Sequence, residues 1–277
     1  MKENSLNELS AVVIVLNNVK NIARCIESIQ TQGVFKIIVV DGGSTDGTLE
    51  ILKKYKCEVY QIGKTGLSHA RQFGVNKVDT KYVALVDSDN ILDKFCFKDI
   101  LIDFENEKFV GIAAQKKSYR NNNYYCNFQE WMNSKKVNKY GQKKVIGTPA
   151  IYLTDILKNV NQYDENVKIG DDTDLCYRLS KKGYFVGTGS GICFEMMMDN
   201  FKEFQQKAYL YGKADCEFFL KYRERRHDIG SHAIRNYLIK MIYFAIIDFK
   251  FQYLPLIFIY SFSRFSGLYF NLIKKSN

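Results

Sequence analysis

The sequence predicts an α/β fold with a mostly parallel sheet, and three observations lead to this prediction. Four short apolar runs, at residues 9–16, 35–40, 57–62 and 82–86, have the length and β-branched composition of buried strands. Segments with the character of helices lie between them, and each run leads into Asn, Asp or Gly. Strands and helices alternating in this way are typical of the nucleotide-binding half of an α/β protein.

The helices follow from local spacing. Apolar residues recur at helical intervals from Ile22 to Ile29, and Asn21 can cap that helix. The Gly-rich residues 41–48 lead into a helix over 49–55. A third helix runs to Gly74, with Ser68 as its cap and with His69 and Arg71 on its outward face.

The fourth strand ends in Asp87, Ser88 and Asp89. Because side chains alternate along an extended strand, the two carboxylates point to the same side. Ligands of open α/β sheets bind beyond the carboxyl ends of the strands, so this pair is a candidate site for a divalent cation or a hydroxyl-rich ligand. The alternative is an acidic strand exit whose aspartates are merely solvated.

Composition narrows the possible functions. The chain has 277 residues, 46% of them hydrophobic, and only two prolines, which favours a folded globular protein. Its formal charge of +10 suggests an anionic partner, and residues 201–277 hold 13 Lys or Arg against 6 Asp or Glu. No dinucleotide, P-loop or nucleic-acid recognition motif is present. The seven cysteines have no paired spacing and the first residues no secretory character, so we expect reduced thiols and a cytosolic or cytosol-facing protein.

Four motifs in order carry a resemblance to a known family. They are an Asn after the first strand (LNNVKN), the loop DGGSTD after the second, SHAR before the acidic strand, and DSD after it. Together they resemble the N-terminal half of family 2 glycosyltransferases, the inverting group with the GT-A fold. The segments VIGTPA (145–150) and GDDTDL (170–175) resemble the second half of that catalytic domain, with Asp171 in place of the family's usual Glu.

The resemblance implies roles for particular residues. Asp172 would be the general base that deprotonates the acceptor, although it could instead be an N-terminal helix cap. Asp41 could merely cap its loop, and Arg71 could be a solvated helix residue. The residues expected to bind the donor are Leu16, Asn17, Asp41, Lys64, Arg71, Asp87 and Asp171.

A metal site is expected by the same resemblance. Mg²⁺ or Mn²⁺ would be held by Asp89 and Asp87 and would offset charge on the leaving diphosphate. The family often has a metal-binding His after the next strand. This chain has none there, and Glu195 could supply an oxygen ligand instead.

We expect two domains, a catalytic domain over residues 1–200 and a basic, aromatic-rich helical region over 201–277. The apolar runs 237–247 and 251–273 suggest interfacial or hairpin helices held against an anionic membrane surface. The basic residues expected to reach the headgroups are Lys240, Lys250, Arg264, Lys274 and Lys275. A soluble helical cap is the alternative. Residues 120–136 are expected to form a mobile acceptor loop, or a simple surface insertion, and Trp131 in it either stacks on a sugar or packs internally.

The favoured function is an inverting, metal-dependent glycosyltransferase at the cytoplasmic face of the membrane. It would use a nucleoside diphosphate sugar and a saccharide or lipid-linked acceptor, with no nucleic acid as partner. The alternatives are a nucleotidyltransferase of related fold and a nucleotide-sugar-binding scaffold that has lost turnover.

Overall fold

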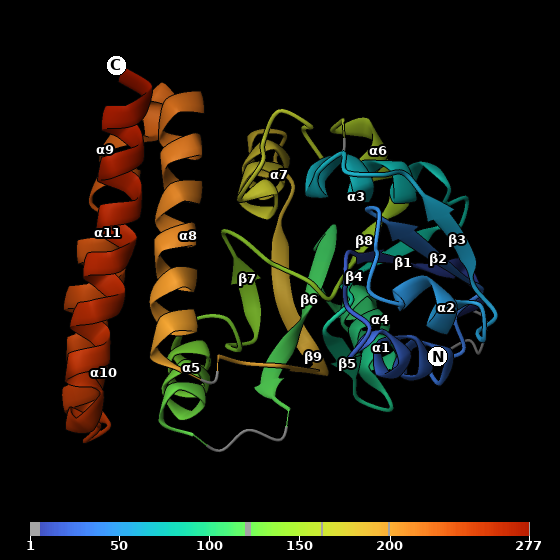
Figure 1. Cartoon of the computed structure of the whole chain (residues 1–277), viewed down its shortest axis with the longest axis horizontal. Helices are drawn as coiled ribbons and strands as arrows, with labels where there is room; N and C mark the ends of the chain where they lie inside the picture. The colour runs from blue at the N-terminus through green and yellow to red at the C-terminus, as the bar shows by residue number, and fades with distance from the viewer. Residues whose placement is uncertain (1–5, 120–122, 162, 199, 277) are drawn as a thin grey trace. The chain divides into compact units, whose positions relative to one another are not determined.

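The structure, a computed structural model, describes residues 6–119, 123–161, 163–198 and 200–276 (Figure 1). It divides into two compact units. The first comprises Met1–Tyr119, Val137–Asn166 and Asp171–Met196, and the second Arg120–Lys136, Val167–Gly170 and Met197–Asn277. The sequence-based division at residue 200 stays a prediction.

The first unit is built on a nine-stranded sheet. Its strands are β1 Leu9–Val15, β2 Lys36–Asp41, β3 Glu58–Gln61, β4 Tyr82–Asp87, β5 Asn90–Leu92, β6 Gly111–Ser118, β7 Gly141–Lys143, β8 Ala150–Leu153 and β9 Val186–Glu195. Its helices are α1 Ile22–Gln30, α2 Thr48–Leu52, α3 Leu67–Asn76, α4 Cys96–Asn106, α6 Thr154–Asn159 and α7 Asp171–Lys181, with a 3₁₀ turn, η1, at Leu6–Glu8.

The strand order is β3-β2-β1-β4-β8-β6-β9-β5, and β7 pairs with β9. The first four strands are mutually parallel, as the βα alternation predicts. Strand β8 runs antiparallel between β4 and β6, while β9 is parallel to β6. Because neighbouring parallel strands end at the same edge, the loops after β1, β2 and β4 meet there.

Both faces of the sheet are buried, which explains why its central strands are continuously apolar. Alternate residues of β1, such as Val13, pack with α1, α2 and α4, and the intervening ones, such as Val12, pack with α3, α6 and α7. Helix α3 lies very close to β1, since a Cβ on Gly74 would come within 2.3 Å of Val12 Cγ1. Glycine at this position therefore sets the height of α3 above the sheet.

The second unit is helical in the described residues. Its helices are α5 Tyr124–Lys135, α8 Phe201–Lys221, α9 Arg226–Gly230, α10 Lys240–Ile247 and α11 Leu254–Ser276, with shorter turns η2 Arg223–Arg225 and η4 Phe251–Tyr253 and a π-helical segment η3 Ala233–Ile239. Helices α8 and α11 touch through glycines: a Cβ on Gly212 would meet the Arg264 carbonyl oxygen at 1.9 Å, and one on Gly267 the Tyr209 carbonyl oxygen at 2.2 Å.

The expected acceptor loop at residues 120–136 is instead mainly a helix. Residues 120–122 lie outside the described residues, but Asn123 caps α5 by accepting hydrogen bonds from the backbone N–H groups of Tyr125 and Cys126. Trp131 of this helix packs in an aromatic core with Phe128 and Tyr253, and its indole N–H donates to Asp248 at 2.6 Å. Of the two expectations for Trp131, stacking on a sugar or packing internally, the structure shows internal packing.

Candidate active site

The loops at the carboxyl ends of β1, β2 and β4 are joined by side-chain hydrogen bonds. The backbone N–H of Asn17 donates to Ser44 Oγ at 2.9 Å, and Thr45 N–H donates to Asn17 Oδ1 at 2.8 Å. Asn18 Nδ2 donates to Ser88 Oγ at 2.9 Å, which brings in the acidic loop. The three predicted motifs thus share one edge of the sheet, and the left-handed backbone of Asn17, with φ of +50°, suits asparagine.

Asp41 is fully buried, and its carboxylate accepts hydrogen bonds from the backbone N–H groups of Gly43 and Ser44, both at 3.0 Å. In this structure the side chain therefore caps its own loop, as the structural alternative proposed. Gly43 approaches Gly63, beside the exposed Lys64, and Leu16 is exposed at the end of β1. Lys64 and Leu16 thus border the same edge.

Arg71 is the centre of the site. Its side chain is 3% exposed and donates hydrogen bonds to three carboxylates, from Nη2 to Asp87 Oδ1 at 2.8 Å and from Nη1 to Asp171 Oδ2 at 2.7 Å and Asp172 Oδ1 at 2.9 Å. The expectation that Arg71 faces outward on its helix is wrong. The guanidinium is turned inward because three charge-assisted bonds offset its desolvation.

This arrangement joins distant parts of the sequence. Asp87 ends β4, whereas Asp171 and Asp172 begin α7, where negative charge is favourable. Thr148, from the VIGTPA segment, donates its hydroxyl to Asp87 Oδ2, and Gly147 lies against Asp172. The predicted general base and the acidic strand exit therefore belong to one cluster.

The carboxylates differ in their protonation. Burial raises the pKa of Asp172 to about 7, in spite of the Arg71 guanidinium beside it, and also raises the pKa of Asp171. Burial opposes ionisation of Asp87 as well, but Arg71 and the Thr148 hydroxyl outweigh it and lower its pKa. The cluster therefore contains an ionised carboxylate at Asp87 and one at Asp172 that titrates near neutral pH.

Two further predicted residues lie near the acidic loop. Asp89 is partly buried and accepts from the Asn90 amide at 3.3 Å, and Asn90 is opposite Glu195 in the ladder between β5 and β9. Glu195 forms an ion pair with the half-buried Lys116 at 2.8 Å. This pair occupies the Oε2 oxygen of the Glu195 carboxylate. Among the residues that the structure describes, no group of three or more His, Cys, Asp or Glu side chains is placed to hold a metal ion.

Sequence reasoning did not single out Lys116, Thr148 or Tyr163. Tyr163 is buried under the guanidinium, with its ring centre 5.4 Å from Arg71 Cζ. Thr148 lies in the segment VIGTPA, which resembles the family pattern, but only the folded chain shows that its side chain reaches the cluster. His69 is partly exposed and paired with Glu165 at 3.0 Å, away from the Arg71 bonds.

This fold defines an α/β protein whose candidate ligand site lies beyond the carboxyl ends of parallel strands. The chain belongs to glycosyl transferase family 2, whose family model matches residues 10–169.

Individual relatives agree with the family assignment. The chain is 26% identical over 191 residues to an uncharacterized glycosyltransferase of Rickettsia bellii, covering 65% of this chain and 27% of that protein. It is 34% identical over 92 residues to glycosyltransferase GlyG of Streptococcus pneumoniae, covering 30% of this chain and 31% of that protein. It is also 27% identical over 202 residues to the minor teichoic acid biosynthesis protein GgaB of Bacillus subtilis, covering 63% and 21%. The chain thus matches about a third or less of the length of these relatives.

Solved structures show the same fold. S. aureus TarS 1-349 superposes with a TM-score of 0.55 at 17% identity, covering 76% of this chain and 65% of that one. The structure of TarS 1-349 in complex with UDP gives a TM-score of 0.54 at 17% identity, covering 94% and 88%. The predicted GT-A fold is confirmed.

Proposed function

We propose that this chain transfers a sugar from a nucleoside diphosphate sugar to an acceptor hydroxyl, with inversion at the anomeric carbon. The observation that carries the proposal is the contact of Arg71 with both the acidic strand exit at Asp87 and the aspartate pair that begins α7. Membership of glycosyl transferase family 2 supports a transferase, and the UDP complex of TarS supports a nucleotide donor.

Asp172 is the proposed general base. A carboxylate with a pKa of about 7 accepts a proton readily near neutral pH. In the proposed step the acceptor oxygen forms a bond to the anomeric carbon, its proton passes to Asp172, and the bond from that carbon to the diphosphate breaks. A single displacement of this kind inverts the configuration. The contact with Arg71 fixes the direction in which the carboxylate faces.

The donor is proposed to lie along the joined loops. Asn17 and Lys64 border the nucleotide, together with Leu16 and the loop that Asp41 caps. Because Asp41 already accepts two backbone hydrogen bonds, its contribution in this proposal is to shape the loop. Arg71 and Asp171 hold the sugar-facing side of the site.

A divalent cation, Mg²⁺ or Mn²⁺, is proposed to be held chiefly by Asp89, with Asp87 nearby. Mg²⁺ in such sites commonly takes only one or two carboxylates and completes its shell with water and substrate phosphates. The residues present fit that mode, because Glu195 is paired with Lys116 and Asp87 already accepts from Arg71 and Thr148. When bound, the ion offsets negative charge on the diphosphate.

The acceptor is proposed to be a saccharide or a lipid-linked saccharide, at the cytoplasmic face of a membrane. The name of GgaB, a minor teichoic acid biosynthesis protein, supports a role in cell-surface polymers. In the described residues, one helical stretch, Phe251–Lys275, is long and apolar enough to cross a membrane by length and composition, which is weak support for a membrane location.

The test combines binding and turnover. Purified chain would be screened by thermal shift against UDP, GDP, CDP and dTDP, and then assayed for transfer or hydrolysis of the matching sugar donors. Asp172→Asn should lose turnover by about 10²–10⁴-fold and keep nucleotide affinity within a few fold. Asp155→Asn, at an exposed carboxylate in the first turn of α6, serves as the control. Full turnover in Asp172→Asn would refute the assignment of the base, and nucleotide binding without turnover of any donor would favour the scaffold alternative.

A further inference from the structure

The long apolar stretch of α11 contains one charged residue, Arg264, which faces α8. Between Phe251 and Ile273 the only ionisable residue of the Asp, Glu, Lys, Arg and His types is Arg264. Its guanidinium is buried and donates to Asp215 of α8, from Nε to Oδ2 at 2.6 Å and from Nη2 to Oδ1 at 2.9 Å. The expectation that Arg264 reaches lipid headgroups is therefore wrong, and the outer side of this stretch carries no charge.

The outer side of α11 is instead a stripe of exposed apolar side chains. They recur at intervals of three and four residues, which places them on one helix face. The stripe consists of Phe258 (53% exposed), Phe262 (72%), Phe265 (38%), Tyr269 (52%) and Ile273 (42%).

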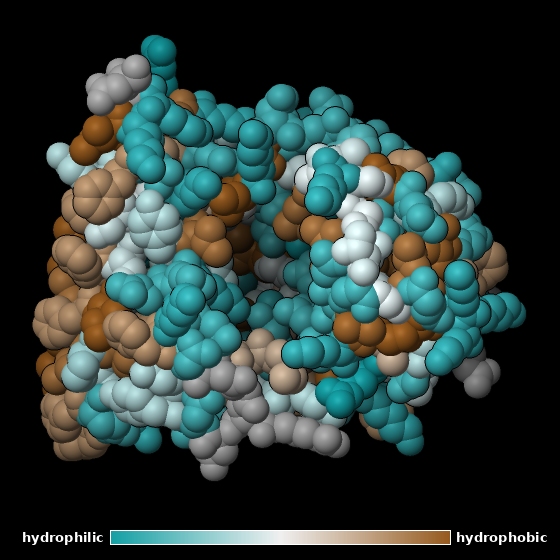
Figure 2. Space-filling model, viewed as in Figure 1, coloured by the Kyte–Doolittle hydropathy of each residue, from teal (hydrophilic) through white to brown (hydrophobic). Residues whose placement is uncertain are grey.

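Helix α10 and the turn after it carry further exposed apolar residues, namely Tyr243, Ile246, Ile247, Phe249 and Phe251. We call the stripe and these residues the outer aromatic face. Figure 2 shows brown and tan side chains gathered over α10 and α11. Exposed apolar surfaces of this kind mark interaction sites.

Lysines stand at the ends of this face. Lys240 begins α10, Lys250 lies between Phe249 and Phe251, and Lys274 and Lys275 end α11. An apolar face bounded by basic residues matches the boundary of an anionic bilayer, where aromatic rings enter the headgroup layer and lysines reach lipid phosphates.

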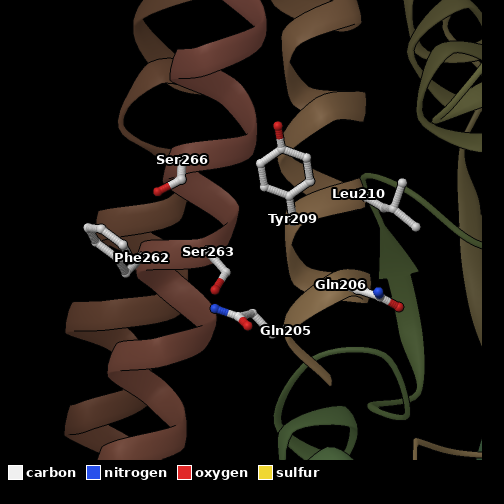
Figure 3. Close-up of a pocket in the computed structure, with 7 residues that line it drawn as sticks. All are labelled: Gln205, Gln206, Tyr209, Leu210, Phe262, Ser263 and Ser266. Carbon is white, nitrogen blue, oxygen red and sulfur yellow. The ribbon is translucent and has the colours of Figure 1, made fainter. Parts of the chain in front are cut away.

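A groove borders the stripe. It has a volume of about 480 Å³ and lies between α8 and α11, lined by Tyr209, Leu210 and Phe262 together with polar side chains such as Gln205 and Ser263 (Figure 3). Phe262 belongs to both the groove and the stripe. The lining is wide enough and apolar enough to receive part of a lipid acyl chain from the same surface.

We propose that the outer aromatic face docks onto an anionic phospholipid bilayer, with α11 lying along the interface and not spanning it. Part of the apolar stretch is committed to packing within the unit, since 44% of its most apolar window is buried. A second copy of the chain would bring its own lysines to the same face, so like charges would oppose such a dimer. The inference deepens the proposed membrane location and does not depend on sugar transfer.

The first test is flotation of the full chain with vesicles of phosphatidylcholine, with and without phosphatidylglycerol. Binding should require phosphatidylglycerol and weaken with salt. The triple variant Phe258→Ser, Phe262→Ser, Phe265→Ser should bind at least about tenfold more weakly. The matched control replaces three exposed phenylalanines of the first unit, Phe35, Phe95 and Phe185, with serine and should bind as the parent chain does. Equal loss in both variants, or none in either, would overturn the proposal.

The second test measures how deeply α11 enters the bilayer and does not rely on a loss of binding. The reporters Phe258→Trp, Phe265→Trp and Ile273→Trp lie along about 22 Å of helix, and the quenching of each by brominated lipids would be measured above the background that Trp131 gives in the parent chain. Equal, shallow quenching supports a helix in the plane of the interface. Quenching that differs with position along the helix would show that α11 spans the bilayer. A dimer mass by light scattering, together with no vesicle binding, would show that the outer aromatic face joins two copies of the chain.

Discussion

Replacing Arg71 with methionine should destabilise the protein in a strongly pH-dependent way. The guanidinium bonds three carboxylates at 2.7–2.9 Å, and its side chain is 3% exposed. Removing one partner of a buried ion pair costs about 3–5 kcal/mol. We therefore expect Arg71→Met to lose about 4 kcal/mol of unfolding free energy at pH 8.

The loss should shrink at lower pH. In the parent chain burial already raises the pKa values of Asp171 and Asp172 above their unfolded values near ~4. Without the guanidinium these two pKa values rise further, and burial then raises the pKa of Asp87 as well. A carboxyl whose pKa is raised in the folded state stabilises that state at low pH, and the benefit disappears as pH rises toward the folded pKa. In the parent chain the lowered pKa of Asp87 acts the opposite way, stabilising the fold at higher pH. The gap between parent and variant should therefore be less than half as large at pH 5.

Urea unfolding at pH 5, 6.5 and 8 measures this gap directly. The comparison variant is Arg178→Met, whose guanidinium pairs with Asp174 at 2.7 Å and is 22% exposed. The difference in unfolding free energy between the parent chain and Arg178→Met should be smaller and should increase less with pH. A gap for Arg71→Met that is no larger at pH 8 than at pH 5 would show that the three aspartates are not electrostatically dependent on this residue.

Three further outcomes are expected. Transfer by the parent chain should rise with pH up to about 7, because Asp172 must be ionised to accept a proton, and kcat/KM profiles should lose this limb in Asp172→Asn. Addition of Mn²⁺ should enhance the thermal shift that a nucleoside diphosphate gives, and EDTA should cancel this enhancement. The variant Asp89→Asn should show no enhancement by Mn²⁺. An enhancement as large as that of the parent chain would exclude Asp89 as a metal ligand. Gly212→Ala should cost about 1–3 kcal/mol in urea unfolding, because its Cβ would lie 1.9 Å from a carbonyl oxygen, whereas Gly230→Ala, with its nearest neighbour at 3.9 Å, should change stability by no more than about 0.5 kcal/mol.

The first half of the sheet could be predicted from the sequence because its central strands have a clear hydrophobic pattern. β1, β2 and β4 are buried on both faces and are therefore continuously apolar. The later strands carry weaker signals. β8 has four residues and β7 is Gly-Gln-Lys, and β9 contains three glycines that look like a loop.

The glycines of β9 have a structural reason that no periodicity reveals. A Cβ on Gly187 would meet the Phe109 ring at 2.4 Å, one on Gly189 the Asp103 carboxylate at 2.3 Å, and one on Gly191 the Cys96 carbonyl oxygen at 2.5 Å. Close packing against β9 thus selects glycine over the β-branched residues that usually mark a strand.

The candidate site divides in the same way. Motif order was enough to bring Asn17, Asp41 and Asp87 to one edge of the sheet, because parallel topology alone places them there. The orientation of Arg71 was not predictable, since an arginine on a short helix faces water unless partners from elsewhere neutralise it. Those partners, Asp171 and Asp172, lie 100 and 101 residues further along the chain.

The close packing of α3 on β1 determines where the guanidinium of Arg71 lies. Arg71 stands three residues before Gly74, whose missing side chain lets the helix rest on Val12. A methyl group at Gly74 would raise the helix and carry the guanidinium away from its aspartates without touching any polar atom. Loss of the proposed activity is therefore expected from a substitution at a buried, apolar position, and a search for inactive variants confined to charged residues would overlook it.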